Sequence, residues 1–182
     1  MIAAYGTSGG GIWTGRAVFV VITAVLILLY LFSFGTPGRQ PPLPDLLYCS
    51  IICVVVRRPG AAPFWLVVPV LLVADIFHMR PLGLWTLIIV GISEIARYNR
   101  AVFLNQVFVV EWLAAMAGFL LALGIQQIAM ILLLVNTPPF ETVFWTMITT
   151  ALAYPLVVAL WSGVLGFRKP HPAEVDFARD DG

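Results

Sequence analysis

Residues 102–135 read VFLNQVFVVEWLAAMAGFLLALGIQQIAMILLLV and form the longest apolar stretch of the chain. Glu111 is the only charged residue among these 34 positions. A helix that crosses a membrane needs about 20 consecutive apolar residues, so this stretch is long enough to do so. Hydrophobic residues make up 61% of the whole chain and charged residues only 10%, far from the composition of soluble domains. The sequence therefore predicts an all-α protein that is embedded in a membrane.

Five further apolar runs lie on either side of this stretch, separated by proline, glycine and charged residues. We predict a bundle of about six transmembrane helices, at residues 17–34, 43–56, 61–77, 82–96, 102–135 and 142–166. The second and fourth runs are shorter than a normal span, so they must use polar flanks, thin the bilayer or be shielded by longer neighbours. These runs define a single transmembrane domain, residues 1–167, followed by a flexible cytoplasmic tail, residues 168–182.

The fifth run is longer than one span requires. It is either a long tilted helix or a span that continues into a surface segment after a bend near Gly124, Gln126 and Gln127. We expect a single span, because no cation between Arg100 and Arg168 marks an additional cytoplasmic loop.

The positive charges support this span count. With six spans, eight cationic residues fall on one side of the membrane and only Arg39 and Arg80 on the other. The eight are Arg16, Arg57, Arg58, Arg97, Arg100, Arg168, Lys169 and Arg179. Because short cytoplasmic loops are enriched in Lys and Arg, we predict that both termini are cytoplasmic.

The sequence contains no recognisable catalytic or metal-binding motif. His78 and His171 fall on opposite sides of the predicted membrane, so they cannot share a metal ion. Cys49 and Cys53 lie one helical turn apart and are best interpreted as small packing residues. The connections between the runs are too short to form a soluble catalytic domain, and the scattered cations do not form a nucleic-acid-binding surface. We therefore expect no enzymatic activity, no metal, no cofactor and no nucleic-acid partner.

Glu111 is the clearest candidate for a functional residue inside the membrane, because burying a charge in lipid is costly unless the charge is paired or hydrated. It follows Arg100 by eleven residues, so one continuous helix would place it about 16 Å into the membrane. Four small residues follow on the same helix face: Ala114, Ala115, Gly118 and Ala122. Such a stripe allows close helix packing, either within the bundle, which we favour, or against the helix of a partner.

Three other carboxylates are predicted at the outer surface. Asp45 and Glu141 begin predicted helices, where a carboxylate is favoured by the helix dipole and caps free amide groups. Asp75 ends the third run and lies beside His78 and Arg80 in the sequence. Capping is the expected role of Asp45 and Glu141.

Several short motifs follow one another between Leu43 and Arg100. They are Leu43-Pro44-Asp45-Leu46-Leu47, Arg57-Arg58-Pro59, Pro63-Phe64-Trp65, Asp75-Ile76-Phe77 and Arg80-Pro81-Leu82-Gly83. In order and spacing, this set resembles the rod shape-determining protein MreD family, and the length and six-span layout extend the resemblance over nearly the whole chain. The chain departs from the family pattern at His78-Met79, where a glycine is often found.

This resemblance implies a non-catalytic component of the bacterial inner membrane that serves cell elongation and peptidoglycan synthesis. Proteins of the MreD family associate with the bitopic protein MreC. Through MreC they join MreB filaments, RodA and its class B penicillin-binding transpeptidase in the elongasome. The fold would resemble that of the substrate-binding subunits of energy-coupling-factor transporters. Membrane lipids are the other expected contacts.

A protein with almost no mass outside the membrane offers a partner only a transmembrane surface and short rims. For an MreC-like partner we therefore expect binding first at an outer rim that contains Asp45, Asp75, Arg80, Pro81 and Gly83. The second candidate is the packing interface formed by Glu111, Ala114, Ala115, Gly118 and Ala122.

The alternative function is that of a membrane subunit that binds a small molecule in a vitamin-type uptake transporter. Such subunits also have six spans in about this length. They commonly carry an Ala-x-x-x-Ala motif on the first helix, whereas Ala17 and Ala24 lie seven residues apart here. They also need a polar pocket, and the only polar groups deep in the predicted bundle are Glu111 and a few uncharged side chains.

Overall fold

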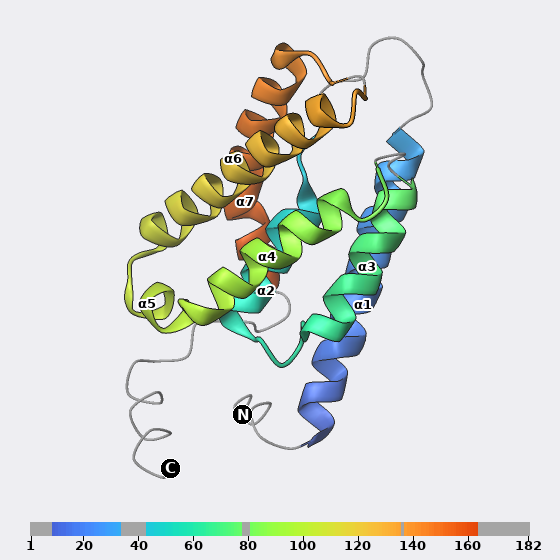
Figure 1. The fold of residues 1–182 in the computed structure, drawn as a ribbon. Helices are drawn as coiled ribbons and strands as arrows, with labels where there is room; N and C mark the ends of the chain where they lie inside the picture. The colour runs from blue at the N-terminus through green and yellow to red at the C-terminus, as the bar shows by residue number, and fades with distance from the viewer. Residues whose placement is uncertain (1–8, 34–42, 78–80, 136, 164–182) are drawn as a thin grey trace.

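The computed structural model describes residues 9–33, 43–77, 81–135 and 137–163. All regular secondary structure in these ranges is α-helical, which confirms the predicted all-α class. The described residues form seven helices: α1 (Gly9–Ser33), α2 (Leu46–Arg57), α3 (Phe64–Phe77), α4 (Leu84–Tyr98), α5 (Arg100–Asn105), α6 (Phe108–Leu132) and α7 (Phe140–Gly163) (Figure 1).

In the part of the chain that the structure describes, three helices are long and apolar enough to cross a membrane. The corresponding segments are Gly11–Leu31 in α1, Phe108–Leu132 in α6 and Phe140–Gly163 in α7. The apolar helices α2 and α3 are shorter, at 12 and 14 residues, and α4 has 15 residues. Together with the composition, these helices define a helical membrane protein.

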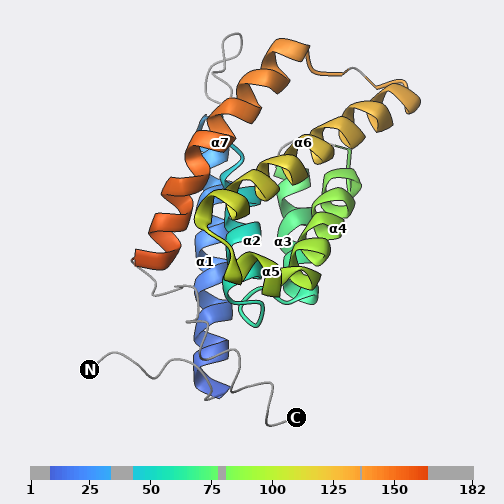
Figure 2. The same ribbon diagram turned by 90° about the vertical axis from the view of Figure 1, so that its left-hand side faces the viewer.

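The short helix α2 forms the centre of the molecule. Every residue from Leu47 to Arg57 is buried, and α2 contacts α1, α4, α5, α6 and α7 (Figures 1 and 2). A helix that is apolar on all sides is stable only when other elements surround it. The structure therefore accounts for the short second run: its longer neighbours shield it.

The predicted 102–135 run is not one helix. α5 ends at Asn105, Gln106 has an extended backbone with φ −93° and ψ 160°, and α6 begins at Phe108. α6 then continues without interruption through Gly124, so the alternative bend near Gly124, Gln126 and Gln127 is wrong. The interruption lies at the other end of the run, where two polar residues precede the apolar helix.

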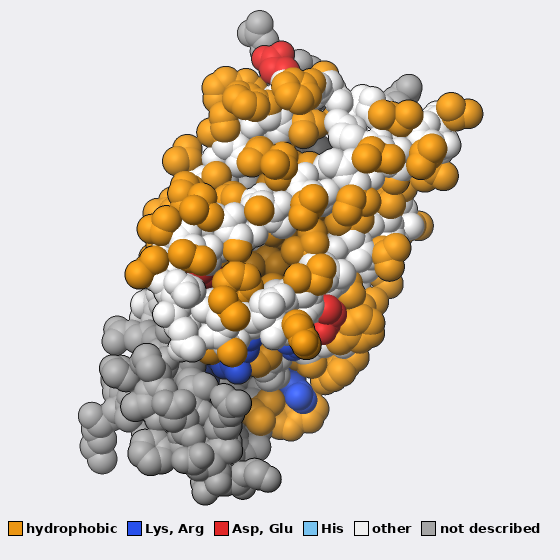
Figure 3. Space-filling view, turned by 60° about the vertical axis from the view of Figure 1, so that its left-hand side comes forward, with side chains coloured by type: hydrophobic (Ala, Val, Ile, Leu, Met, Phe, Trp, Pro, Cys, Tyr) orange, Lys and Arg blue, Asp and Glu red, His pale blue; other side chains and the backbone are white. Residues whose placement is uncertain are grey.

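Five arginines lie at one end of the bundle, which we call the arginine end: Arg16, Arg57, Arg58, Arg97 and Arg100. The α2–α3 turn, the junction of α4 with α5 and the start of α6 meet there. In Figure 3, hydrophobic side chains cover most of the coloured face, and arginine side chains lie near the lower edge of that face. The other predicted cytoplasmic cations, Arg168, Lys169 and Arg179, lie outside the described residues, as do Arg39 and Arg80.

Candidate functional site

A buried ion pair joins α2 to α6 near the arginine end. The Nη2 atom of Arg57 lies 3.1 Å from Oε1 and 3.3 Å from Oε2 of Glu111. The Tyr154 hydroxyl, from α7, donates a hydrogen bond of 3.2 Å to Glu111 Oε1. The side chains of Arg57 and Glu111 are 6% and 1% exposed. Three helices that are distant in sequence are therefore connected through one carboxylate.

The main role of this ion pair is to fix the arrangement of the helices that it joins. Removing two charges from water costs several kcal/mol for each ion, and the attraction between them offsets this cost only when the geometry is good. Arg57 Nε is buried and has no hydrogen-bond partner among the described residues. Because either partner alone would be an uncompensated buried charge, the pair strongly favours the helix arrangement in which both charges meet.

The position of Glu111 differs from the sequence prediction. A continuous helix from Arg100 would have carried Glu111 about 16 Å into the bundle. Because the chain is interrupted between α5 and α6, Glu111 instead lies in the first turn of α6 and reaches the last turn of α2. Arg57 is predicted among the cytoplasmic cations, but in the structure it is buried. One available signal was missed: Cys49, Cys53 and Arg57 are spaced by four residues, so Arg57 shares a helix face with two buried cysteines.

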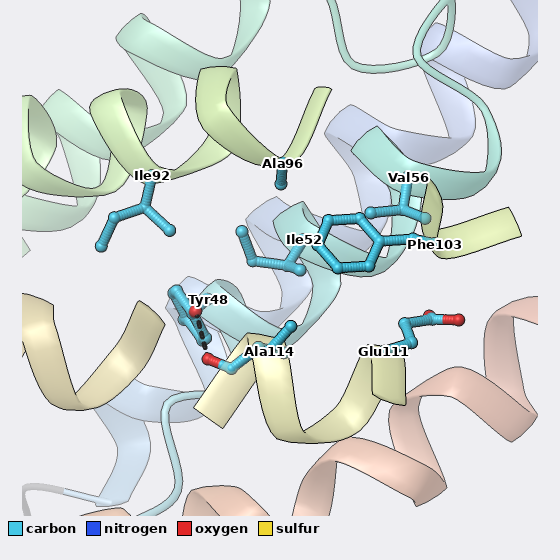
Figure 4. A pocket seen from close by; sticks show the side chains of 9 residues that line it. Tyr48, Ile52, Val56, Ile92, Ala96, Phe103, Glu111 and Ala114 are labelled. Carbon is cyan, nitrogen blue, oxygen red and sulfur yellow. Dashed lines mark hydrogen bonds between the residues drawn. The ribbon is translucent and has the colours of Figure 1, made fainter. Parts of the chain in front are cut away.

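A small cavity lies beside this ion pair. It is lined by Tyr48, Ile52, Val56, Ile92, Ala96, Phe103, Glu111, Ala114 and Ala115. Its volume is about 30 Å³, room for about one water molecule. Figure 4 shows that the carboxylate of Glu111 points away from the other labelled side chains. This cavity is too small for a vitamin-sized ligand.

The small-residue stripe of α6 lies against helices of the same chain. Ala115 and Ala122 are buried, and α6 contacts α4 and α2 along this face. The Tyr48 hydroxyl donates a 2.6 Å hydrogen bond to the carbonyl oxygen of Ala115 (Figure 4). A methyl group at Gly118 would lie 3.0 Å from that hydroxyl and 3.1 Å from Ile92 Cγ2. Internal packing therefore occupies the interface that contains Ala114, Ala115, Gly118 and Ala122.

At the opposite end of the bundle, Asp75 connects α3 to α4. Its Oδ2 atom accepts hydrogen bonds from the backbone N–H of Gly83 at 3.0 Å, from the backbone N–H of Thr86 at 3.3 Å and from the Thr86 hydroxyl at 2.8 Å. Gly83, the residue that precedes α4, has a left-handed backbone with φ 83°, which favours glycine. Asp75 thus caps α4 from the neighbouring helix, which sequence spacing did not predict.

The residues of the predicted outer rim differ in exposure. Asp75 is 1% exposed, so its carboxylate lies inside the bundle. Asp45 accepts a 2.9 Å hydrogen bond from the backbone N–H of Tyr48, which confirms the predicted cap of the second helix. Pro81 and Gly83 are half-buried, and Arg80 lies outside the described residues.

Arginine side chains also bind the α2–α3 turn. Arg97 donates to the carbonyl oxygens of Pro59 at 3.2 Å and Ala62 at 2.8 Å, and Arg100 donates to that of Val56 at 2.8 Å. The last carbonyl groups of a helix have no partner within the helix and carry partial negative charge. Arg97 therefore supplies hydrogen bonds to two carbonyl oxygens of the α2–α3 turn, and Arg100 supplies one to a carbonyl oxygen at the end of α2.

No family model matches the chain, and no curated protein or solved structure is significantly similar to it. The described residues define the class of the molecule as a helical membrane protein whose interior charges connect its helices.

Proposed function

We propose that this protein is a non-catalytic membrane scaffold, with six spans and both termini in the cytoplasm, that holds and orients the membrane segment of a partner. The observation that supports the proposal is that the buried charged side chains bind other groups of the same bundle. Arg57 and Glu111 pair with each other, and Asp75 caps a neighbouring helix. The bundle therefore offers a partner mainly apolar lateral faces and short rims.

The finer proposal is a role like that of MreD proteins in the bacterial inner membrane. The partner would then be MreC, with MreB, RodA and a class B penicillin-binding transpeptidase in the same complex. The order of the motifs between Leu43 and Arg100 supports this proposal, together with the span layout.

The proposed contact surface is the rim formed by Pro81, Leu82 and Gly83. Leu82 is 70% exposed and follows a proline, so it projects from the α3–α4 connection. The α6 stripe packs against helices of the same chain, so we choose the described, partly exposed part of the expected outer rim, Pro81 and Gly83, together with the adjacent Leu82. A photo-crosslinking amino acid at position 82 would capture the partner, whereas the same probe at Phe140, which is 81% exposed at the start of α7, serves as the control.

The identity of the partner is tested by mild detergent extraction of the tagged protein from its native membrane, followed by mass spectrometry. Recovery of MreC with elongation synthases would support the scaffold proposal. Recovery of an ATPase module with its coupling subunit would overturn it in favour of the transporter function.

A further inference from the structure

One arginine at the arginine end is held between two tryptophan rings. The guanidinium carbon of Arg16 lies 5.0 Å from the ring centre of Trp13 and 5.2 Å from that of Trp65. Trp13 is one turn before Arg16 on α1, and Trp65 is at the start of α3. Both distances are within the range of cation–π attraction, so the side chain is fixed in position by two helices.

Only part of the Arg16 guanidinium is used within the protein. Its Nε donates a 3.1 Å hydrogen bond to the carbonyl oxygen of Gly60 in the α2–α3 turn. Among the described residues, Arg16 forms no ion pair with a carboxylate. Its terminal nitrogens therefore remain available as a planar pair of donors, the geometry that binds phosphate oxygens.

The surrounding charge favours an anion at this position. The arginine end contains five arginines but only two described carboxylates, Glu94 and Glu111. Glu111 pairs with Arg57, and Glu94 pairs with Arg97 at 3.1 Å. Neither carboxylate neutralises Arg16, so no described residue compensates the positive charge beside the two rings.

The two rings also place this site at the edge of a bilayer. Trp13 and Trp65 are 66% and 56% exposed, and Trp13 lies near the start of the apolar segment Gly11–Leu31. Phe64, next to Trp65, is 54% exposed. Exposed aromatic rings of this kind lie at the level of the lipid headgroups. α1 and α3 lie side by side here, and the first turns of α1 extend beyond the α2–α3 turn (Figures 1 and 2).

We propose that Trp13, Arg16 and Trp65 form a binding site for an anionic phospholipid. The terminal nitrogens of Arg16 bind the phosphate group, and the exposed rings contact the glycerol and the upper acyl chain. The apolar rings distinguish a lipid from free phosphate, and the uncompensated charge distinguishes an anionic lipid from a zwitterionic one. This inference does not depend on the proposed scaffold function.

The experiment is native mass spectrometry of the detergent-purified full chain titrated with phosphatidylglycerol or phosphatidylcholine. The variants are Arg16→Gln and Arg16→Lys, with Arg100→Gln as a control that removes one charge from the same end. We expect Arg16→Gln to weaken phosphatidylglycerol binding about fivefold. Arg16→Lys should retain only part of the affinity, because an ammonium group lacks the planar donor pair. Binding of phosphatidylcholine should be equal in all variants.

Two further measurements distinguish binding of a lipid from binding of a free phosphate group. Excess inorganic phosphate should not displace the lipid if the rings contribute, and Trp65→Leu should weaken binding although the net charge is unchanged. Equal losses of phosphatidylglycerol affinity in Arg16→Gln and Arg100→Gln would overturn the proposed site, because the net charge alone would then explain binding. Displacement of the lipid by inorganic phosphate would also overturn it. Circular dichroism before titration ensures that only folded variants are compared.

Discussion

At the scale of single residues, the most consequential interaction is the buried pair of Arg57 and Glu111. Glu111→Gln removes the negative charge and leaves the Arg57 guanidinium buried without an ionic partner. We expect the free energy of unfolding to fall by about 3–5 kcal/mol. The measurement is reversible denaturation in mixed micelles. Glu94→Gln is the matched control: its pair with Arg97 is partly exposed, so the loss should be below about 1 kcal/mol.

The double variant Arg57→Met with Glu111→Gln distinguishes a charge effect from a packing effect. Because it removes both charges, it should be more stable than Glu111→Gln alone. A double variant that is less stable than the single one would show that the shape of Arg57, and not its charge, is what the site requires.

Gly118 provides a second prediction at this scale. In Gly118→Ala the new methyl group would approach the Tyr48 hydroxyl to 3.0 Å and Ile92 to 3.1 Å, so the Tyr48 bond to Ala115 must shift. We expect a loss of about 1–3 kcal/mol in the same denaturation measurement. Gly124 lies on the same helix, and a methyl group there would meet no described atom within 4 Å beyond its chain neighbours and its own helix backbone. Gly124→Ala should therefore be neutral or stabilising, because alanine favours helix. Equal effects of the two variants would contradict this tight packing.

At the scale of the helices, the connection between α3 and α4 depends on Asp75. Asp75→Ala removes the acceptor for the Gly83 and Thr86 amides, so the first turn of α4 should open more often. Hydrogen exchange of the peptides that contain these amides should become faster in the variant. Asp45→Ala, which removes the cap of α2, should affect the Tyr48 region instead. Unchanged exchange at Gly83 and Thr86 would remove Asp75 from this role.

The sequence predicted the helices more accurately than their contacts. The starts and ends of the second, third and fourth runs lie within three residues of α2, α3 and α4, because proline, glycine and charge interrupt the apolar pattern there. The α5–α6 interruption was missed because Asn105 and Gln106 are short polar breaks in an otherwise apolar run. The pairing of Arg57 with Glu111 was missed for a different reason: it joins residues 54 positions apart, and no local pattern specifies such a contact.

At the scale of the whole molecule, the topology decides whether the arginine end faces the cytoplasm. In a six-span arrangement, α3 crosses the membrane, so the α2–α3 turn and the α3–α4 connection lie on opposite sides. Gly60 and Leu82 are both exposed in these two connections. The native Cys49 and Cys53 are completely buried, so they should react slowly with a maleimide in the folded protein.

Single substitutions Gly60→Cys and Leu82→Cys, labelled in whole spheroplasts with a membrane-impermeant maleimide, therefore report the two sides directly. We expect Leu82→Cys to react in intact spheroplasts and Gly60→Cys to react only after permeabilisation, because positively charged loops are retained in the cytoplasm. Reaction of both positions from the same side would mean that α3, with 14 residues, does not cross the bilayer. The six-span arrangement would then be wrong, and α2 and α3 would form a hairpin that enters and leaves the membrane on the same side.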